Sequence, residues 1–153
     1  MININVFSEE KAWSKRLKKK NIFFNNICKA FPKNYKFPNK KISFSLLLSN
    51  NKNIRKLNKK FRNKNKPTDI LSFPDNIRLK ISKNTYIGDI IISYNFIDKP
   101  RCQQMKYFKE RLIKTFIHGY LHLLGFDHIS NKDHLKMLKE EEKIYQSVIS
   151  KLS

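Results

Sequence analysis

The sequence predicts an α+β fold in which a small mixed β-sheet of about four strands is covered by helices. Segments with the alternation of strands and segments with helical spacing both occur, without the strict alternation of a parallel α/β fold. The chain has 153 residues, a length that suits one hydrophobic core. We therefore expect a single domain over residues 1–153.

The first third of the chain predicts a strand, one helix and a second strand. Residues 2–6 alternate between isoleucine or valine and asparagine, which is typical of a strand. Ser8, followed by two glutamates, has the pattern of a helix N-cap, and we expect one helix from there toward Ala30. The segment KISFSLLLSN, residues 41–50, alternates again and predicts the second strand.

The middle third predicts a helix and two further strands. Ser49 or Asn50 can cap a helix that ends in the segment NKNKP, because proline and the residue before it disfavour helix. The segment DILSFP, residues 69–74, predicts a short third strand. The segment YIGDIIIS, residues 86–93, predicts a fourth strand that is buried on both faces, because its end is apolar.

The last third predicts two helices. Apolar residues keep helical spacing from Arg101 to Leu124, and Gly125 should end this long helix as a C-terminal glycine. Ser130 with Asp133 three residues later is a capping-box pattern, which predicts the start of a final helix.

The charge of the chain is strongly positive, with 33 Lys and Arg against 12 Asp and Glu and a net charge of +21. Such a surface attracts polyanions such as nucleic acid or anionic membranes. A second interpretation is equally open. Lys, Asn, Ile and Phe are the residues that an AT-rich genome favours, so much of the charge can reflect composition. Charge alone therefore supports nucleic-acid binding only weakly.

The cysteines and the hydropathy indicate a cytoplasmic protein. Cys28 and Cys102 lie far apart and form no Cys-x-x-Cys pair, so we expect two reduced thiols that behave as small apolar residues. No apolar run approaches the ~18 residues of a membrane span. The first residues, MININVF, are too short and too alternating for a signal peptide.

The segment HGYLHLLGFDH holds three of the four histidines, His118, His122 and His128. On a helix the first two lie one turn apart on one face, and Gly125 lets the chain turn so that the third returns to them. Three imidazoles with an open fourth position are typical of a catalytic zinc site. The alternative, three unrelated histidines, fits this spacing poorly. The fourth histidine, His134, we expect on the surface.

The same segment has the HxxxHxxGxxH spacing of metzincin proteases, with one difference. Those proteases carry, directly after the first histidine, the glutamate that acts as general base. Here that position is Gly119, which cannot take a proton, so peptide hydrolysis is the weaker interpretation. Asp127 has two open roles: accepting a hydrogen bond from a ligand imidazole, or capping the turn. Arg111 and Thr115 share the histidine face, but we favour plain helix surface for both.

A second group of polar residues surrounds the predicted third strand, where Arg62 is followed by Thr68, Asp69 and Ser72. Arginine binds phosphate oxygens in a bidentate manner and stays protonated. Beside a zinc ion it would neutralise charge that develops on a phosphorane. From composition alone, however, one more solvated charge is the better interpretation of Arg62.

Three blocks of this chain resemble the YbeY family of metal-dependent, single-strand-specific endoribonucleases. The blocks are LNKKFRNKNKPTDILSFP, GDIIIS and HGYLHLLGFDH, and the resemblance runs from about Ile54 to His128. The chain departs from the family in FRNKNKP, where acidic or glycine residues are frequent, and in Phe126, where tyrosine is usual. Neither departure touches a ligand position.

The resemblance implies one zinc ion per chain, held by His118, His122 and His128, and a requirement for Arg62 in RNA cleavage. It also implies maturation of ribosomal RNA, especially the small-subunit 3′ end, and ribosome quality control. The expected partners are single-stranded RNA, ribosomal RNA or the small ribosomal subunit, with no membrane, and we expect a monomer. Zinc-activated water and the RNA 2′-hydroxyl both fit as nucleophile.

Two alternatives to this function stay open. The first is a zinc peptidase, against which Gly119 argues because it supplies no base. The second is a non-catalytic, zinc-stabilised module that binds the ribosome through its basic face. An open metal coordination position argues against that second alternative.

Overall fold

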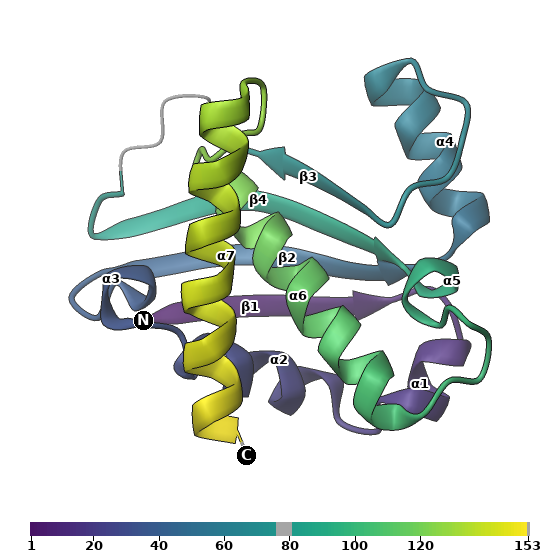
Figure 1. Cartoon of the computed structure of the whole chain (residues 1–153), viewed down its shortest axis with the longest axis horizontal. Helices are drawn as coiled ribbons and strands as arrows, with labels where there is room; N and C mark the ends of the chain where they lie inside the picture. Colours follow the sequence, from purple (N-terminus) through teal and green to yellow (C-terminus); the bar gives the residue numbers. More distant parts are fainter. Residues whose placement is uncertain (76–80, 153) are drawn as a thin grey trace.

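The computed structural model of the chain describes residues 1–75 and 81–152, and a four-stranded sheet lies at its centre (Figure 1). The strands are β1 (Ile2–Ser8), β2 (Lys41–Ser49), β3 (Ile70–Pro74) and β4 (Asn84–Ser93), in the order β1-β2-β4-β3. β1, β2 and β4 run parallel, whereas β3 pairs antiparallel with β4 at the edge. The predicted α+β class and mixed sheet are confirmed.

Helices cover both faces of this sheet to different extents. The helices are α1 (Ala12–Arg16), α2 (Lys20–Lys29), α3 (Lys33–Lys36), α4 (Asn51–Arg62), α5 (Tyr94–Ile97), α6 (Met105–Leu123) and α7 (Asn131–Leu152). In Figure 1, α6 and α7 cross in front of the strands, and Phe116 and Tyr120 of α6 are fully buried there. On the other face α4 packs Ile54 against Leu71 and Ile91. The alternation of β3 therefore divides its side chains between α4 and α6.

The prediction of one helix from Ser8 to Ala30 is wrong, because Ser8 belongs to β1 and two helices follow it. At Leu17 the backbone is extended, with φ −125° and ψ 99°, and this separates α1 from α2. The buried Trp13 explains the break: its indole Nε1 donates to the backbone carbonyl of Ser49 at 2.8 Å. With Trp13 fixed at the end of β2, the chain must turn before α2 can place Phe24 in the core.

Of the two glutamates expected to start that helix, Glu9 instead binds β2. The backbone N–H of Glu9 donates to Leu48 at 3.0 Å, and the carboxylate of Glu9 accepts a hydrogen bond from the Ser49 hydroxyl. The Ser8 hydroxyl donates to the carbonyl of Glu10 at 3.2 Å, so no side chain caps α1. Glu9 thus extends the β1–β2 pairing one residue beyond the end of β1.

The other two N-cap predictions are confirmed by hydrogen bonds. The side chain of Asn50 accepts from the backbone N–H of Asn53 at 2.9 Å at the start of α4. The hydroxyl of Ser130 accepts from the backbone N–H of Asp133 at 3.1 Å at the start of α7. Each side-chain oxygen satisfies a donor that would otherwise lack an intrahelical partner.

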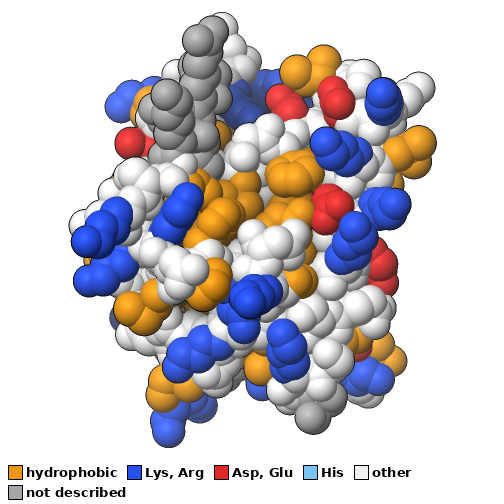
Figure 2. All heavy atoms as spheres, turned by 90° about the vertical axis from the view of Figure 1, so that its left-hand side faces the viewer, with side chains coloured by type: hydrophobic (Ala, Val, Ile, Leu, Met, Phe, Trp, Pro, Cys, Tyr) orange, Lys and Arg blue, Asp and Glu red, His pale blue; other side chains and the backbone are white. Residues whose placement is uncertain are grey.

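The basic residues are spread over the surface. Figure 2 shows the side of the molecule opposite to α4, and Lys and Arg side chains also gather there, around a hollow of hydrophobic side chains. The net charge is therefore not confined to one face, which agrees with a compositional contribution. In the described parts of the chain, no helix has both the length and the hydrophobicity that crossing a membrane requires.

The two cysteines are both free, and their surroundings differ. Cys28 is buried on α2, whereas Cys102 is exposed, so only Cys28 behaves as a core residue. Burial raises the pKa of the Cys28 thiol to about 12.

We predict that a thiol reagent modifies one cysteine of the native protein rapidly and the other only after unfolding. Since the thiolate is the nucleophile, a pKa of about 12 leaves roughly one Cys28 in 10⁴ reactive at pH 8. Reagent uptake followed by mass spectrometry measures both rates. Cys102→Ser should remove the fast reaction, and rapid native modification of Cys28 would contradict the buried placement.

Candidate metal centre and its cleft

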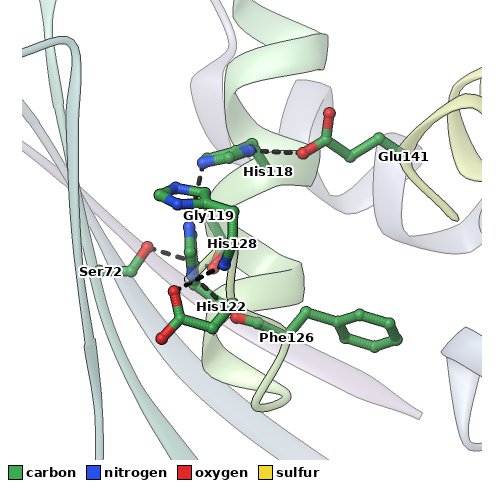
Figure 3. A network of polar contacts seen from close by, with 8 residues as sticks. Ser72, His118, Gly119, His122, Phe126, His128 and Glu141 are labelled. Carbon is green, nitrogen blue, oxygen red and sulfur yellow. Dashed lines mark hydrogen bonds and ion pairs between the residues drawn. The ribbon is translucent and has the colours of Figure 1, made fainter. Parts of the chain in front are cut away.

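The end of α6 and the turn that follows it bring three histidines together (Figure 3). The Nε2 atoms of His118 and His122 lie 3.0 Å apart. The ring centroid of His128 lies 5.7 Å from that of His118 and 5.2 Å from that of His122. One ligand nitrogen from each ring lies within 4.8 Å of the others, so the three residues could hold a metal ion.

The turn that brings His128 back toward the other two histidines is a Schellman motif. As predicted, Gly125 ends the helix there as a C-terminal glycine. Gly125 has φ +98°, a conformation that side chains other than glycine rarely adopt. Its N–H donates to the carbonyl of His122 at 3.1 Å, and the N–H of Phe126 donates to Leu121 at 3.0 Å. Asp127 accepts from the backbone N–H of His128 at 2.8 Å, which supports its capping role.

Hydrogen bonds at Nδ1 orient two of the rings. His118 Nδ1 contacts the carboxylate of Glu141 on α7, and His122 Nδ1 lies 2.9 Å from the backbone carbonyl of Phe126 (Figure 3). Both acceptors are oxygens, so each Nδ1 carries the proton and donates it. In the neutral rings this leaves each Nε2 with the lone pair that can bind a metal ion.

The donor set and its spacing fit a zinc ion. Two nitrogens at ~2.0–2.1 Å from a tetrahedral zinc are about 3.3 Å apart, close to the 3.0 Å between His118 and His122. Burial lowers the pKa of His122, and the neighbouring rings of His118 and His128 lower it further. A lowered pKa keeps His122 neutral, which is the form that binds metal.

Glu141 is the contact that sequence reasoning missed. It lies 23 residues after His118, so no local spacing connects the two. The available signal is in α7, where Met137, Ile144 and Val148 form the buried stripe against the core. Position 141 continues that stripe, and an acid on an apolar stripe indicates a polar partner on the facing helix.

Gly119 has a packing role that its sequence context did not reveal. A Cβ atom there would lie 2.5 Å from Ile70 Cδ1, 3.1 Å from Ser72 Oγ and 3.2 Å from Ile90 Cγ2. The Ser72 hydroxyl also donates to the carbonyl of Gly119 at 3.2 Å (Figure 3). The helix therefore touches β3 and β4 at the residue between the histidine face and the core. The Cβ of a metzincin-type glutamate would point at these side chains of the sheet, and the end of Ile70 would have to shift to admit it.

The histidines open into a cleft of about 440 Å³ between β3, α6 and the end of α4. It is lined by Arg62, Thr68, Asp69, Ile70, Ser72, Pro74, His118, His122, Gly125, Phe126, Asp127 and His128. Every residue that the sequence singled out around the third strand thus reaches one cleft with the three histidines. Within the described residues, no ion pair involves Arg62, whose side chain is exposed.

Three residues near the site lie outside this cleft. Arg111 donates to the carbonyl of Phe96 at 3.2 Å, and Thr115 donates to the carbonyl of Arg111 at 2.8 Å, consistent with the helix surface we favoured. His134 is exposed, as expected, although its ring centroid lies 6.2 Å from that of His128.

The fold and the cleft define an α+β protein with a three-histidine site of the kind that holds a metal ion. A family model described as Endoribonuclease YbeY matches residues 4–149. A Pelagibacter ubique protein named Endoribonuclease YbeY is 56% identical over the whole of both chains. The protein of the same name from Ehrlichia canis is 35% identical over 94% of this chain and 90% of its own length.

The solved structures agree with the fold. The solution structure of TM1509 from Thermotoga maritima matches with a TM-score of 0.59 and 25% identity, over 98% of this chain and 91% of that one. The chain belongs to the YbeY endoribonuclease family. The resemblance that the three sequence blocks predicted is confirmed, and it extends well beyond residues 54–128.

We predict that Glu141→Ala weakens zinc binding by about 10- to 100-fold, because the carboxylate fixes the ring orientation of His118. Glu141→Gln should lose less, since its amide oxygen can still accept the Nδ1 proton. Competition with a chromophoric chelator measures the dissociation constant. The matched control is Glu142→Gln, an exposed neighbour on α7. Equal affinity of wild type and Glu141→Ala would show that the contact does not support the site.

Proposed function

We propose that this protein is a zinc-dependent endoribonuclease that cleaves single-stranded RNA in the cytoplasm. Its proposed role is maturation of ribosomal RNA, including the small-subunit 3′ end, and ribosome quality control. One observation carries the proposal: a cleft of an endoribonuclease-family fold joins a three-histidine set to an arginine with no ion-pair partner among the described residues.

The three histidines are the proposed zinc ligands, with one ion per chain. The chemistry that a bound zinc ion supplies is polarisation of a phosphate oxygen and a lowered pKa of water. The chain's part is to hold the imidazoles neutral and oriented. Glu141 and the carbonyl of Phe126 do this from Nδ1, and the turn at Gly125 positions His128.

Arg62 is the proposed catalytic residue that binds the scissile phosphate. The other polar side chains of the β3 segment already have partners in the fold. Asp69 accepts from the backbone N–H of Ile70 at 2.8 Å and from Thr68 at 3.2 Å, and Ser72 donates to α6. The guanidinium of Arg62 remains available for an anion, and its planar fork matches two phosphate oxygens.

The decisive experiment is incubation of zinc-loaded protein with labelled single-stranded and duplex RNA of one sequence. We expect cleavage of the single strand, loss of cleavage with chelator, and no hydrolysis of an unstructured protein. The product ends identify the nucleophile, because a 2′-hydroxyl attack leaves a cyclic phosphate and a water attack does not. Chelator-sensitive proteolysis without RNA cleavage would replace this proposal with a peptidase.

We predict one zinc ion per chain, lost in the variants His118→Ala, His122→Ala and His128→Ala. Each substitution leaves two imidazoles, too few for the three protein ligands of a catalytic zinc site. Metal analysis of purified protein measures the occupancy. His134→Ala, a histidine outside the cluster, is the control and should keep its zinc. Full occupancy in His128→Ala would mean that the third ligand is misassigned.

We predict that Arg62→Ala folds normally and keeps its zinc but cleaves RNA roughly 10- to 150-fold more slowly. This range follows from losing one charge-assisted hydrogen bond of roughly 1.5–3 kcal/mol. Arg62→Lys should recover part of the rate, because an ammonium lacks the planar fork. The measurement is single-turnover cleavage at saturating protein.

The control for this prediction is Lys60→Ala, which removes the same charge from the same helix. Its saturated cleavage rate should equal that of the wild type, since Lys60 does not line the cleft. Equal losses in Arg62→Ala and Lys60→Ala would remove the special role of Arg62.

A further inference from the structure

Helix α4 and the loop after it carry a long run of positive charge. Residues 51–66 contain no acidic residue and eight basic ones, all of them exposed: Lys52, Arg55, Lys56, Lys59, Lys60, Arg62, Lys64 and Lys66. Within the described residues, none of them takes part in an ion pair. No carboxylate within the described residues therefore offsets the charge of this surface by direct contact.

The charges of α4 do not all point the same way. At ~100° per residue, Arg55, Lys59 and Arg62 fall within about 60° of one another and form a stripe along one side of the helix. Lys60 lies about 160° from Arg62 around the same helix, on the opposite side. Between the two sides, Ile54 and Leu57 pack against the sheet. We call Arg55, Lys59 and Arg62 the α4 stripe.

The α4 stripe is continuous with the cleft. Arg62 stands at its end and lines the cleft, while Arg55 begins it about 10 Å away along the helix, seven residues at ~1.5 Å each. The loop after α4 lies over the same side, because Arg55 Nε donates to Asn65 Oδ1 at 2.9 Å. That loop leads to Thr68 and Asp69, which also line the cleft.

The loop is held in this position by Asn58. Its carbonyl accepts the N–H of Lys64 at 3.2 Å, and its side-chain amide donates to the carbonyl of Lys66 at 2.9 Å. Asn58 is buried, and Asn63 takes the left-handed conformation that ends α4, with φ 58°. These hydrogen bonds thus fix how the loop runs from the end of the stripe to the cleft.

We propose that the α4 stripe binds the phosphates of the RNA strand on one side of the cleavage point. The inference rests on the proposed function, and it names the surface that positions the substrate. Lysine and arginine on an exposed helix contact phosphates without reading bases, so the stripe contributes affinity and direction but no sequence preference. Arg62 binds the phosphate in the cleft, and Lys59 and Arg55 bind the phosphates that follow.

A nucleic-acid strand fits this surface better than a membrane does. Membrane-bound helices combine basic residues with an exposed apolar face. The apolar residues of α4 face the sheet, and the exposed Phe61 packs edge-on against Phe73 at 5.3 Å between ring centroids. The stripe runs along the helix and ends at the cleft, so a strand that lies along it reaches the histidines.

The test is binding of a fluorescent 12-nucleotide oligouridine to full-length protein treated with chelator, so that cleavage does not interfere. Lys59→Ala should raise the dissociation constant about fivefold, and Arg55→Ala with Lys59→Ala about 25-fold, if each contact contributes about 1 kcal/mol. Lys59→Ala should also reduce the log–log salt slope by about 0.7, the value for one phosphate of a single strand.

Lys60→Ala is the matched control, because it removes the same exposed charge one residue away, about 100° further round α4 and outside the cleft lining. Its dissociation constant and salt slope should equal those of the wild type. If Lys59→Ala and Lys60→Ala change the dissociation constant equally, or if neither changes it, the proposal that the α4 stripe binds RNA is wrong. Thermal unfolding of each variant confirms that the exposed substitutions leave the fold intact.

The two proposals fail separately. If zinc-loaded protein cleaves RNA but the stripe variants bind it as the wild type does, the stripe is wrong and the proposed function stands. If the protein cleaves no RNA but binds it through Lys59 and not Lys60, the endoribonuclease proposal fails while the stripe stands as a binding surface.

Discussion

The close approach of α6 to the sheet at Gly119 is the constraint on which the cleft depends. A glycine there lets the helix backbone lie against Ile70 and Ser72 of the edge strand and against Ile90 of β4. His118 and His122, on the helix face beside this contact, then stand directly over the edge of the sheet. A Cβ atom at 119 would lie 2.5 Å from Ile70 Cδ1, so the end of the Ile70 side chain would have to shift for any longer residue.

The same contact joins the two faces of the sheet. Ile70 and Ser72 face α6, while Leu71 and Phe73 face α4 because side chains alternate along β3. As β3 is an edge strand, Arg62 at the end of α4 can reach around it to the cleft. An arginine from one layer and histidines from the other thus line one cleft beside the edge strand of the described sheet.

The positions of the charged residues say more about this protein than its net charge does. Lys and Arg side chains also gather on the face opposite α4, so the net charge of +21 identifies no particular surface. What distinguishes α4 is its eight exposed basic residues over positions 51–66, together with a stripe that ends at the cleft. At the histidines a single acid acts through a direct contact, because the carboxylate of Glu141 is held against His118.

The sequence by itself determined the features that depend on neighbours along the chain. Strand alternation, the caps at Asn50 and Ser130, the glycine turn at Gly125 and the spacing of the histidines are set within one or two turns of helix. The motif blocks also identified the family, because they preserve that local chemistry. Such features do not depend on how the rest of the chain folds, and for this reason they could be predicted.

Only the tertiary structure decided the contacts between distant segments. The break at Leu17 follows from the hydrogen bond of Trp13 to Ser49, 36 residues away, and local helical spacing continues through it. Glu141 reaches His118 only because α7 packs along α6, and Gly119 matters because β3 passes beneath it. In the sequence Arg62 resembles any other surface charge, and only the structure places it in the cleft that the histidines line. Periodicity records which face of an element is buried, but the partner across that face is set by how the layers pack.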